Sequence, residues 1–127
     1  MIQAGTCGSI INIASVHGFV GSAPNTQAAY VASKGGLVNL TRELSLQWAR
    51  YNINVNAIAP GYFATELTEG LLAEGNESGQ TWVSRNTPMR RPGELHELDG
   101  PLLLLASEAG SYITGHTLAV DGGWLAR

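Results

Sequence analysis

Tyr30 and Lys34 stand four residues apart in a segment whose residue pattern predicts a helix. Residues at i and i+4 share one helix face, so the only lysine of the chain can lie beside this tyrosine. A tyrosine phenol ordinarily ionises near pH ~10, and it serves as an acid and base near neutrality only when a neighbouring cation stabilises its phenolate. The pair therefore predicts proton transfer to or from a substrate oxygen. A solvated pair without chemistry is the alternative, and the surrounding elements must distinguish the two.

A strand and a glycine-bearing loop precede this pair. Residues 9–15 are almost continuously apolar and rich in β-branched side chains, which is typical of a strand covered on both faces. Ser15 marks the carboxyl end of this strand. The loop at residues 18–25 contains Gly, Ser, Pro and Asn, and Asn25 or Thr26 is the predicted cap of the helix that follows.

The next elements complete a strand–helix–strand unit. A helix is predicted over residues 27–50 and a second strand over residues 53–59, which the Pro60–Gly61 turn ends. Such units are right-handed in nearly all proteins, and their two strands run parallel. Ser15 and the turn therefore lie at one edge of a parallel sheet, and Tyr30 lies near the start of the helix between them. This is the edge where open α/β sheets bind ligands.

The remainder of the chain divides into three parts. Residues 62–89 contain a polar segment with Gly and Glu, which predicts either a mobile lid or a plain surface excursion. An amphipathic helix is predicted over residues 94–107, a short strand over residues 117–120 and a turn over residues 121–123. The predicted fold class is α/β, with a parallel sheet that helices cover on both faces.

Composition limits the function classes. The chain has 127 residues, enough for one domain, and a formal charge of −3, which argues against nucleic acid or an anionic membrane as a partner. Its start lacks the basic and apolar regions of a signal peptide, and one cysteine, Cys7, suits a reducing compartment, so a cytoplasmic location is expected. Cys7 has no cationic neighbour that would make it a nucleophile. The residue pattern contains no metal-ligand spacing, and no metal is expected.

These residues together resemble the short-chain dehydrogenase/reductase superfamily, and the resemblance spans the whole chain in order. It is similar in particular to the bacterial sugar-, polyol- and gluconate-type oxidoreductases and to the 3-oxoacyl-carrier-protein reductases. The resemblance is carried by Ser15, Tyr30-x-x-x-Lys34, the segment from Asn56 to Thr65, and the segment from Tyr112 to Gly123.

The resemblance implies a hydride transfer between NAD or NADP and a secondary alcohol or ketone. Tyr30 would give or take the substrate proton, and Lys34 would assist the phenol and hydrogen-bond the nicotinamide ribose. Ser15 would hold the substrate oxygen, where negative charge develops. Beside Tyr30 and Lys34, the residues implied to lie against the cofactor are Pro60, Gly61, Phe63 and Thr65.

Substrate contacts and neighbouring polar residues follow from the same resemblance. Ser15, His17 and Tyr62 are the implied substrate contacts, although a loop histidine such as His17 is more often merely exposed. Asn12, inside the first strand, is expected to serve packing or a backbone bond, and Asp121 to serve the closing turn.

The chain departs from the family pattern on its amino-terminal side. The family's glycine-rich turn, which lays backbone N–H groups against the pyrophosphate, is absent, since no Gly-x-Gly occurs. The asparagine that the family carries on an earlier helix is absent too, Ala14 replaces a frequent second serine, and the loop between Ser15 and Tyr30 is slightly long. Residues 1–127 are thus expected to be the carboxyl-terminal catalytic half of one Rossmann domain with a doubly wound parallel sheet.

Two consequences and two alternatives follow. The sheet edge beside residues 10–15 is expected to be open, so the chain alone should fold marginally, bind dinucleotide poorly and be inactive. The full-length form is expected to be a homo-oligomer. One alternative is a short, non-catalytic product that associates with full-length dehydrogenase subunits, and another is a small-molecule binding module without hydride transfer.

Overall fold

Three parallel strands form the sheet of the protein. The computed structural model describes residues 1–22 and 25–126. β1 (Gly8–Ile13), β2 (Ile53–Pro60) and β3 (Thr117–Val120) lie in the order β1-β2-β3, with β2 in the centre. The predicted α/β class and the parallel pairing are confirmed.

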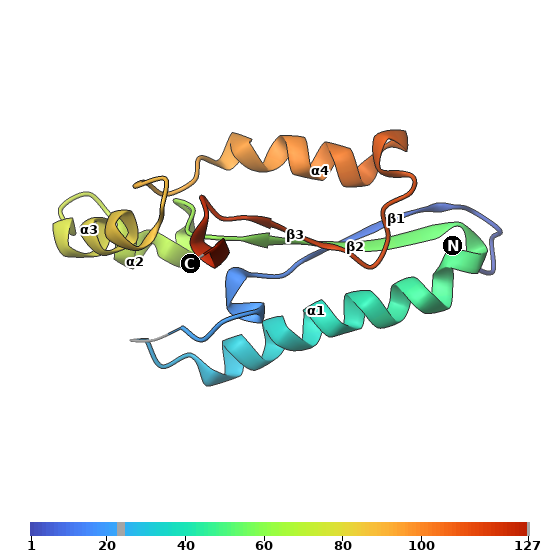
Figure 1. Ribbon diagram of the computed structural model, residues 1–127, viewed down its shortest axis with the longest axis horizontal. Helices are drawn as coiled ribbons and strands as arrows, with labels where there is room; N and C mark the ends of the chain where they lie inside the picture. The colour runs from blue at the N-terminus through green and yellow to red at the C-terminus, as the bar shows by residue number, and fades with distance from the viewer. Residues whose placement is uncertain (23–24, 127) are drawn as a thin grey trace.

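Two helices cover opposite faces of this sheet. α1 (Ala28–Trp48) packs on one face, against β2, and α4 (Asp99–Ala106) packs on the other, mainly against β1 (Figure 1). Both connections lead to the neighbouring strand in the same direction across the sheet, one from β1 to β2 and the other from β2 to β3. Because their helices lie on opposite faces, the two crossovers have opposite hands. The right-handed rule therefore fails for one of them.

The central strand supplies most of the core. Ile53, Val55, Ala57, Ile58 and Ala59 are at most 2% exposed, as expected for a strand covered on both faces. Small residues allow the close approach of α1 to this strand, and the cluster there consists of Ala14, Val38, Ala57 and Ala59.

The start of α1 differs from the prediction. The N-cap is Gln27, and its side chain makes no capping hydrogen bond, so the cap predicted at Asn25 or Thr26 was wrong. Thr26 and Gln27 instead line the cavity described below. In the loop predicted at residues 18–25, Ala23 and Pro24 lie outside the described residues.

The segment between β2 and β3 is more helical than predicted. It forms a 3-10 turn (Glu66–Thr68), α2 (Glu69–Leu72) and α3 (Glu77–Asn86), at one end of the molecule (Figure 1). The side chain of Asn76 accepts a hydrogen bond from the Gly79 N–H and thereby caps α3 within the segment that was predicted as a loop.

The helix predicted over residues 94–107 consists of a 3-10 turn (Leu95–Leu98) followed by α4. The amphipathic interpretation was wrong for α4, because its leucines do not share one face. Leu105 is buried, whereas Leu102, Leu103 and Leu104 are 37–65% exposed.

β1 lies at an open edge of the sheet, as predicted. Within the described part of the chain it pairs only with β2, and Ile13 at its end is 54% exposed. The exposed leucines of α4 extend this apolar surface on the face where α4 packs against β1. No helix among the described residues is both long and apolar enough to cross a bilayer.

Asn56 joins β2 to the loop that leads into β3. Its side chain is fully buried, donates to the Ile113 carbonyl oxygen at 2.7 Å and accepts from the His116 N–H at 3.0 Å. Asn54, two positions earlier on the same strand, donates to the Ser111 carbonyl oxygen at an exposed site. The two asparagines thus bond the same loop, Asn56 in the core and Asn54 at a half-buried position with an exposed bond.

We therefore expect Asn56→Ala to lower the free energy of unfolding by about 2–4 kcal/mol, because two buried backbone groups lose their partners. Asn54→Ala is the matched control and should cost less than about 1 kcal/mol, since water replaces its bond. Urea denaturation of the two variants measures both values. Equal effects would show that burial of the Asn56 bonds does not stabilise this loop.

Candidate active site

A cavity of about 380 Å³ opens at the carboxyl ends of β1 and β2. Ser15 and His17 reach it from the end of β1, and Tyr30 reaches it from the first turn of α1. Gly61 and Tyr62 line it from the turn after β2. The predicted convergence of these segments on one sheet edge is therefore observed.

Ser15 is held in place by the turn that follows it. Its side chain is 6% exposed, and its Oγ accepts a hydrogen bond from the His17 N–H at 3.2 Å, which caps the short 3-10 turn Val16–Gly18. A serine hydroxyl has one donor besides its acceptor lone pairs. With Oγ accepting from the backbone, the hydroxyl proton of Ser15 remains available to a substrate oxygen.

Lys34 lies between Tyr30 and the end of β1. Its Nζ donates to the Ile13 carbonyl oxygen at 2.8 Å and lies 5.6 Å from the centre of the Tyr30 ring. The i, i+4 spacing thus places the ammonium beside the aromatic ring, as expected from the sequence. An ammonium has three N–H donors, so two remain after the bond to Ile13.

Gly18 permits α1 to approach the turn that carries Ser15. A side-chain carbon at this position would lie 2.9 Å from the Lys34 carbonyl oxygen and 2.9 Å from a methyl group of Val38. Because only hydrogen fits there, the turn packs directly on the helix. This contact fixes the distance between Ser15 and the start of α1.

His17 and Tyr62 form a second polar pair in the same cavity. The Nε2 of His17 and the Oη of Tyr62 are 3.2 Å apart, and the His17 ring is 6% exposed. The His17 ring also meets the Tyr30 ring edge-on, with centroids 6.4 Å apart. His17 is therefore buried between the two tyrosines, and the alternative that it is merely exposed is wrong.

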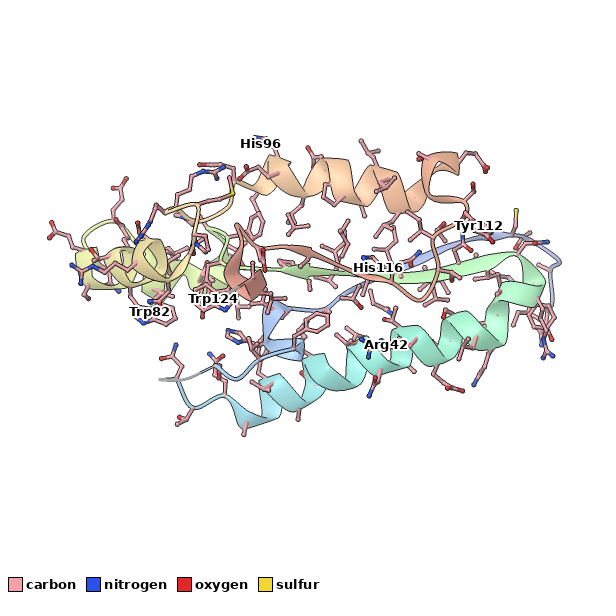
Figure 2. All side chains as sticks on the ribbon, viewed as in Figure 1. Arg42, Trp82, His96, Tyr112, His116 and Trp124 are labelled. Atoms are coloured by element: carbon pink, nitrogen blue, oxygen red, sulfur yellow. The ribbon has the colours of Figure 1, made fainter. Side chains whose placement is uncertain are left out.

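Two tryptophans pack on Tyr62 from distant parts of the sequence. Trp82, on α3, and Trp124, in the last turn, have ring centroids 5.5 and 4.9 Å from that of Tyr62, and 5.6 Å from each other (Figure 2). Burial raises the pKa of Tyr62, and the neighbouring Tyr30 raises it further. Tyr62 therefore stays a neutral hydroxyl throughout the physiological range.

The turn after β2 packs against the turn after β3. A side-chain carbon at Gly61 would lie 2.8 Å from the Cα of Asp121, so glycine allows this contact. Asp121 accepts hydrogen bonds from the Gly123 and Leu125 N–H groups at 2.8 and 2.9 Å. Both carboxylate oxygens thus serve the turn, as expected from the sequence.

Of the residues implied to contact a cofactor, Tyr30 and Gly61 line this cavity, whereas four do not: Lys34, Pro60, Phe63 and Thr65. Phe63 is 6% exposed, packs over Gly93 and lines a smaller cavity of about 100 Å³ beside Asp121. Thr65 is exposed, caps the 3-10 turn Glu66–Thr68 and lies in a separate surface hollow. Pro60 ends β2, opposite Val120 of β3.

The chain matches the family model of the enoyl-(acyl carrier protein) reductases over residues 1–125. It is a short-chain dehydrogenase/reductase. Among its relatives, the 2-dehydro-3-deoxy-D-gluconate 5-dehydrogenase of Escherichia coli is 47% identical over 126 residues, which are 99% of this chain and 48% of that protein. The D-arabinitol 2-dehydrogenase (ribulose-forming) of Scheffersomyces stipitis is 45% identical over 125 residues, covering 98% of this chain and 45% of that enzyme.

Solved structures agree with this assignment. The crystal structure of a gluconate 5-dehydrogenase from Burkholderia cenocepacia, in complex with NADP and tartrate, superposes with a TM-score of 0.90 at 41% identity. The alignment covers 99% of this chain and 48% of that one. The chain thus spans about half the length of the relatives it matches.

Several residues that shape the site of this short-chain dehydrogenase/reductase were not predicted. Leu67 and Leu71, four positions apart in the segment after β2, line the cavity, and the two tryptophans hold Tyr62. The leucine spacing was a usable signal, because i and i+4 share a helix face. The sequence contains no comparable signal for the two tryptophans, because only folding brings residues 82 and 124 together. Within residues 1–22 and 25–126, no three His, Cys, Asp or Glu side chains gather in a way that could hold a metal ion.

The raised pKa of Tyr62 can be tested by titration. In the folded protein its hydroxyl should ionise above its ordinary value of 10.0, because burial disfavours the phenolate. The folded state then keeps a proton that the unfolded state loses, so the free energy of unfolding should fall as the pH rises above about 10. Carbon-13 spectra of the tyrosine Cζ atoms measure this ionisation, and Tyr62→Phe identifies the resonance. Ionisation of Tyr62 at or below its value in urea would contradict the assignment.

Proposed function

We propose that this chain provides the catalytic part of an NAD(P)-dependent oxidoreductase, which transfers a hydride between the nicotinamide and a secondary alcohol or ketone. The observation that carries the proposal is the meeting of Ser15 and Tyr30 in one cavity, with Lys34 beside the Tyr30 ring. Residues 1–127 would form the catalytic half of one Rossmann-type domain. The full-length protein would act as a homo-oligomer in the cytoplasm.

The residues fit the nicotinamide end of such a cofactor. Lys34 has two N–H donors left after its bond to Ile13, which suits the hydroxyl groups of a ribose. Pro60 and Gly61 would support the cofactor at the end of β2, whereas Phe63 and Thr65, which line other hollows, would meet it outside the cavity. When bound, NAD or NADP supplies the hydride chemistry.

The protein's own residues then manage the substrate oxygen and one proton. In the direction of reduction, the Tyr30 hydroxyl donates its proton to the oxygen of the ketone, which becomes the alcohol. Lys34 holds its positive charge 5.6 Å from the centre of the Tyr30 ring, where it would stabilise the phenolate that remains. Ser15 keeps its proton but donates a hydrogen bond to the same oxygen, which stabilises negative charge as it develops there. In oxidation the Tyr30 phenolate takes the proton back.

The substrate class proposed is a sugar acid or a polyol. The E. coli and S. stipitis relatives are named for a deoxy-sugar acid and for a polyol, and the B. cenocepacia structure contains tartrate, a hydroxylated acid. The cavity has room for a substrate of this size, with a volume of about 380 Å³.

Tyr30→Phe in the intact protein tests the role of the hydroxyl. We expect kcat to fall by at least about 100-fold, because general acid–base catalysis typically contributes that much or more. Binding of NADH or NADPH, followed by fluorescence titration, should not change, since the ring and Lys34 remain.

Tyr112→Phe is the matched control, because this hydroxyl is fully exposed at the opposite end of the molecule from the Trp82–Trp124 pair (Figure 2). It should leave both kcat and cofactor binding unchanged. A Tyr30→Phe variant whose kcat stays within a few-fold of the parent value would remove Tyr30 from the proposed role.

A further inference from the structure

The buried ring of His17 has one nitrogen with a partner and one without. Nε2 lies 3.2 Å from the Tyr62 hydroxyl, whereas Nδ1 is buried and has no hydrogen-bond partner among the described residues. A neutral imidazole carries its proton on only one of these atoms. The position of that proton decides the direction of the bond between His17 and Tyr62.

The proton belongs on Nε2. A buried N–H without an acceptor is costly and rare in proteins, whereas an unpaired acceptor is tolerated somewhat better. If Nδ1 carried the proton, the N–H would be buried without an acceptor. With the proton on Nε2, His17 donates to the Tyr62 Oη. The hydroxyl proton of Tyr62 is then free, because the oxygen is already the acceptor.

The Tyr62 ring cannot easily turn its hydroxyl elsewhere. Trp82 and Trp124 pack against the ring, with centroids 5.5 and 4.9 Å away, and His17 bonds the Oη. Tyr62 also lines the cavity that contains Ser15 and Tyr30. Its raised pKa keeps the hydroxyl protonated, so it can act as a donor. The cavity therefore offers a fixed hydroxyl donor besides the two that serve the reacting oxygen.

We propose that Tyr62, oriented by His17, donates a hydrogen bond to a second oxygen of the substrate and thereby selects polyhydroxylated alcohols and ketones over those with a single oxygen. The inference rests on the proposed function, since Ser15 and Tyr30 are taken to bind the reacting oxygen. Tyr62 touches the substrate, whereas His17 is a positioning residue. Leu67 and Leu71, which also line the cavity, would contact carbon atoms of the substrate.

Relative specificity in the intact protein tests this selection. The values of kcat/KM are compared for a hydroxylated set (D-arabinitol, galactitol and D-gluconate) and for pentan-2-ol, which has one hydroxyl. For the best hydroxylated substrate, Tyr62→Phe should lower kcat/KM about tenfold, as the loss of one hydrogen bond implies, and the loss for pentan-2-ol should be clearly smaller. An unchanged ratio, or an equal loss for both substrates, would overturn the proposal.

Substitutions of His17 and NMR spectra of its ring test whether this residue orients Tyr62. The preference is the ratio of kcat/KM for the best hydroxylated substrate to kcat/KM for pentan-2-ol. His17→Gln keeps an N–H donor near Tyr62 and should retain most of this preference. His17→Leu should reduce the preference about as much as Tyr62→Phe does. Long-range proton–nitrogen NMR spectra assign the tautomer of His17 without any turnover. A proton on Nδ1, or equal ratios for the Gln and Leu variants, would show that His17 does not orient Tyr62.

A binding measurement separates this inference from the proposed function. If no alcohol is oxidised, hydride transfer has failed, but binding of the same three compounds can be followed by tryptophan fluorescence, because Trp82 and Trp124 contact Tyr62. Binding that is weakened about tenfold by Tyr62→Phe, and not by Tyr112→Phe, would support the hydrogen bond proposed from Tyr62 to the substrate. Equal binding in both variants, or no binding by the parent protein, would overturn it.

Discussion

The hydrogen bond from the Lys34 ammonium to the Ile13 carbonyl oxygen joins the two elements on which the site depends. It connects the second turn of α1 to the last residue of β1, two positions before Ser15. Gly18 lets the same helix approach the turn after Ser15 on the other side. These contacts hold Ser15 and Tyr30 at one cavity, and a change in the register of either element would displace one of the two residues from it.

Several polar groups at this edge of the sheet have defined partners, and these partners decide which of their atoms remain available. Ser15 accepts from the backbone and keeps its proton, while Asp121 uses both oxygens in the closing turn. Asn12 donates to Thr41 at 3.0 Å and supports the packing of β1 on α1, as its position in the strand suggested. The hydroxyl proton of Ser15 is therefore left for a ligand at the edge of the sheet where the cavity opens.

The sequence was sufficient to predict the strands, the long helix and the meeting of Ser15 with Tyr30, because these depend on short-range periodicity and on the geometry of parallel sheets. It was insufficient where tertiary contacts decide. The cap of α1 was misplaced, since Thr26 and Gln27 line the cavity instead of bonding the helix start. The leucines of α4 suggested one apolar face, but three of them are exposed. The packing of Trp82 and Trp124 on Tyr62 has no local signal, because it depends on long-range folding.

The long connection between β2 and β3 leaves the sheet at the edge where the cavity opens and returns at the opposite edge. The groups proposed to move the proton precede it, on β1 and α1, whereas Tyr62, Leu67, Leu71 and Trp82 all lie within it. Substitutions in this connection can reshape the pocket without touching a strand of the sheet or the Lys34 bond. The stretch that shapes the pocket can therefore differ between two chains whose residues proposed to move the proton are the same.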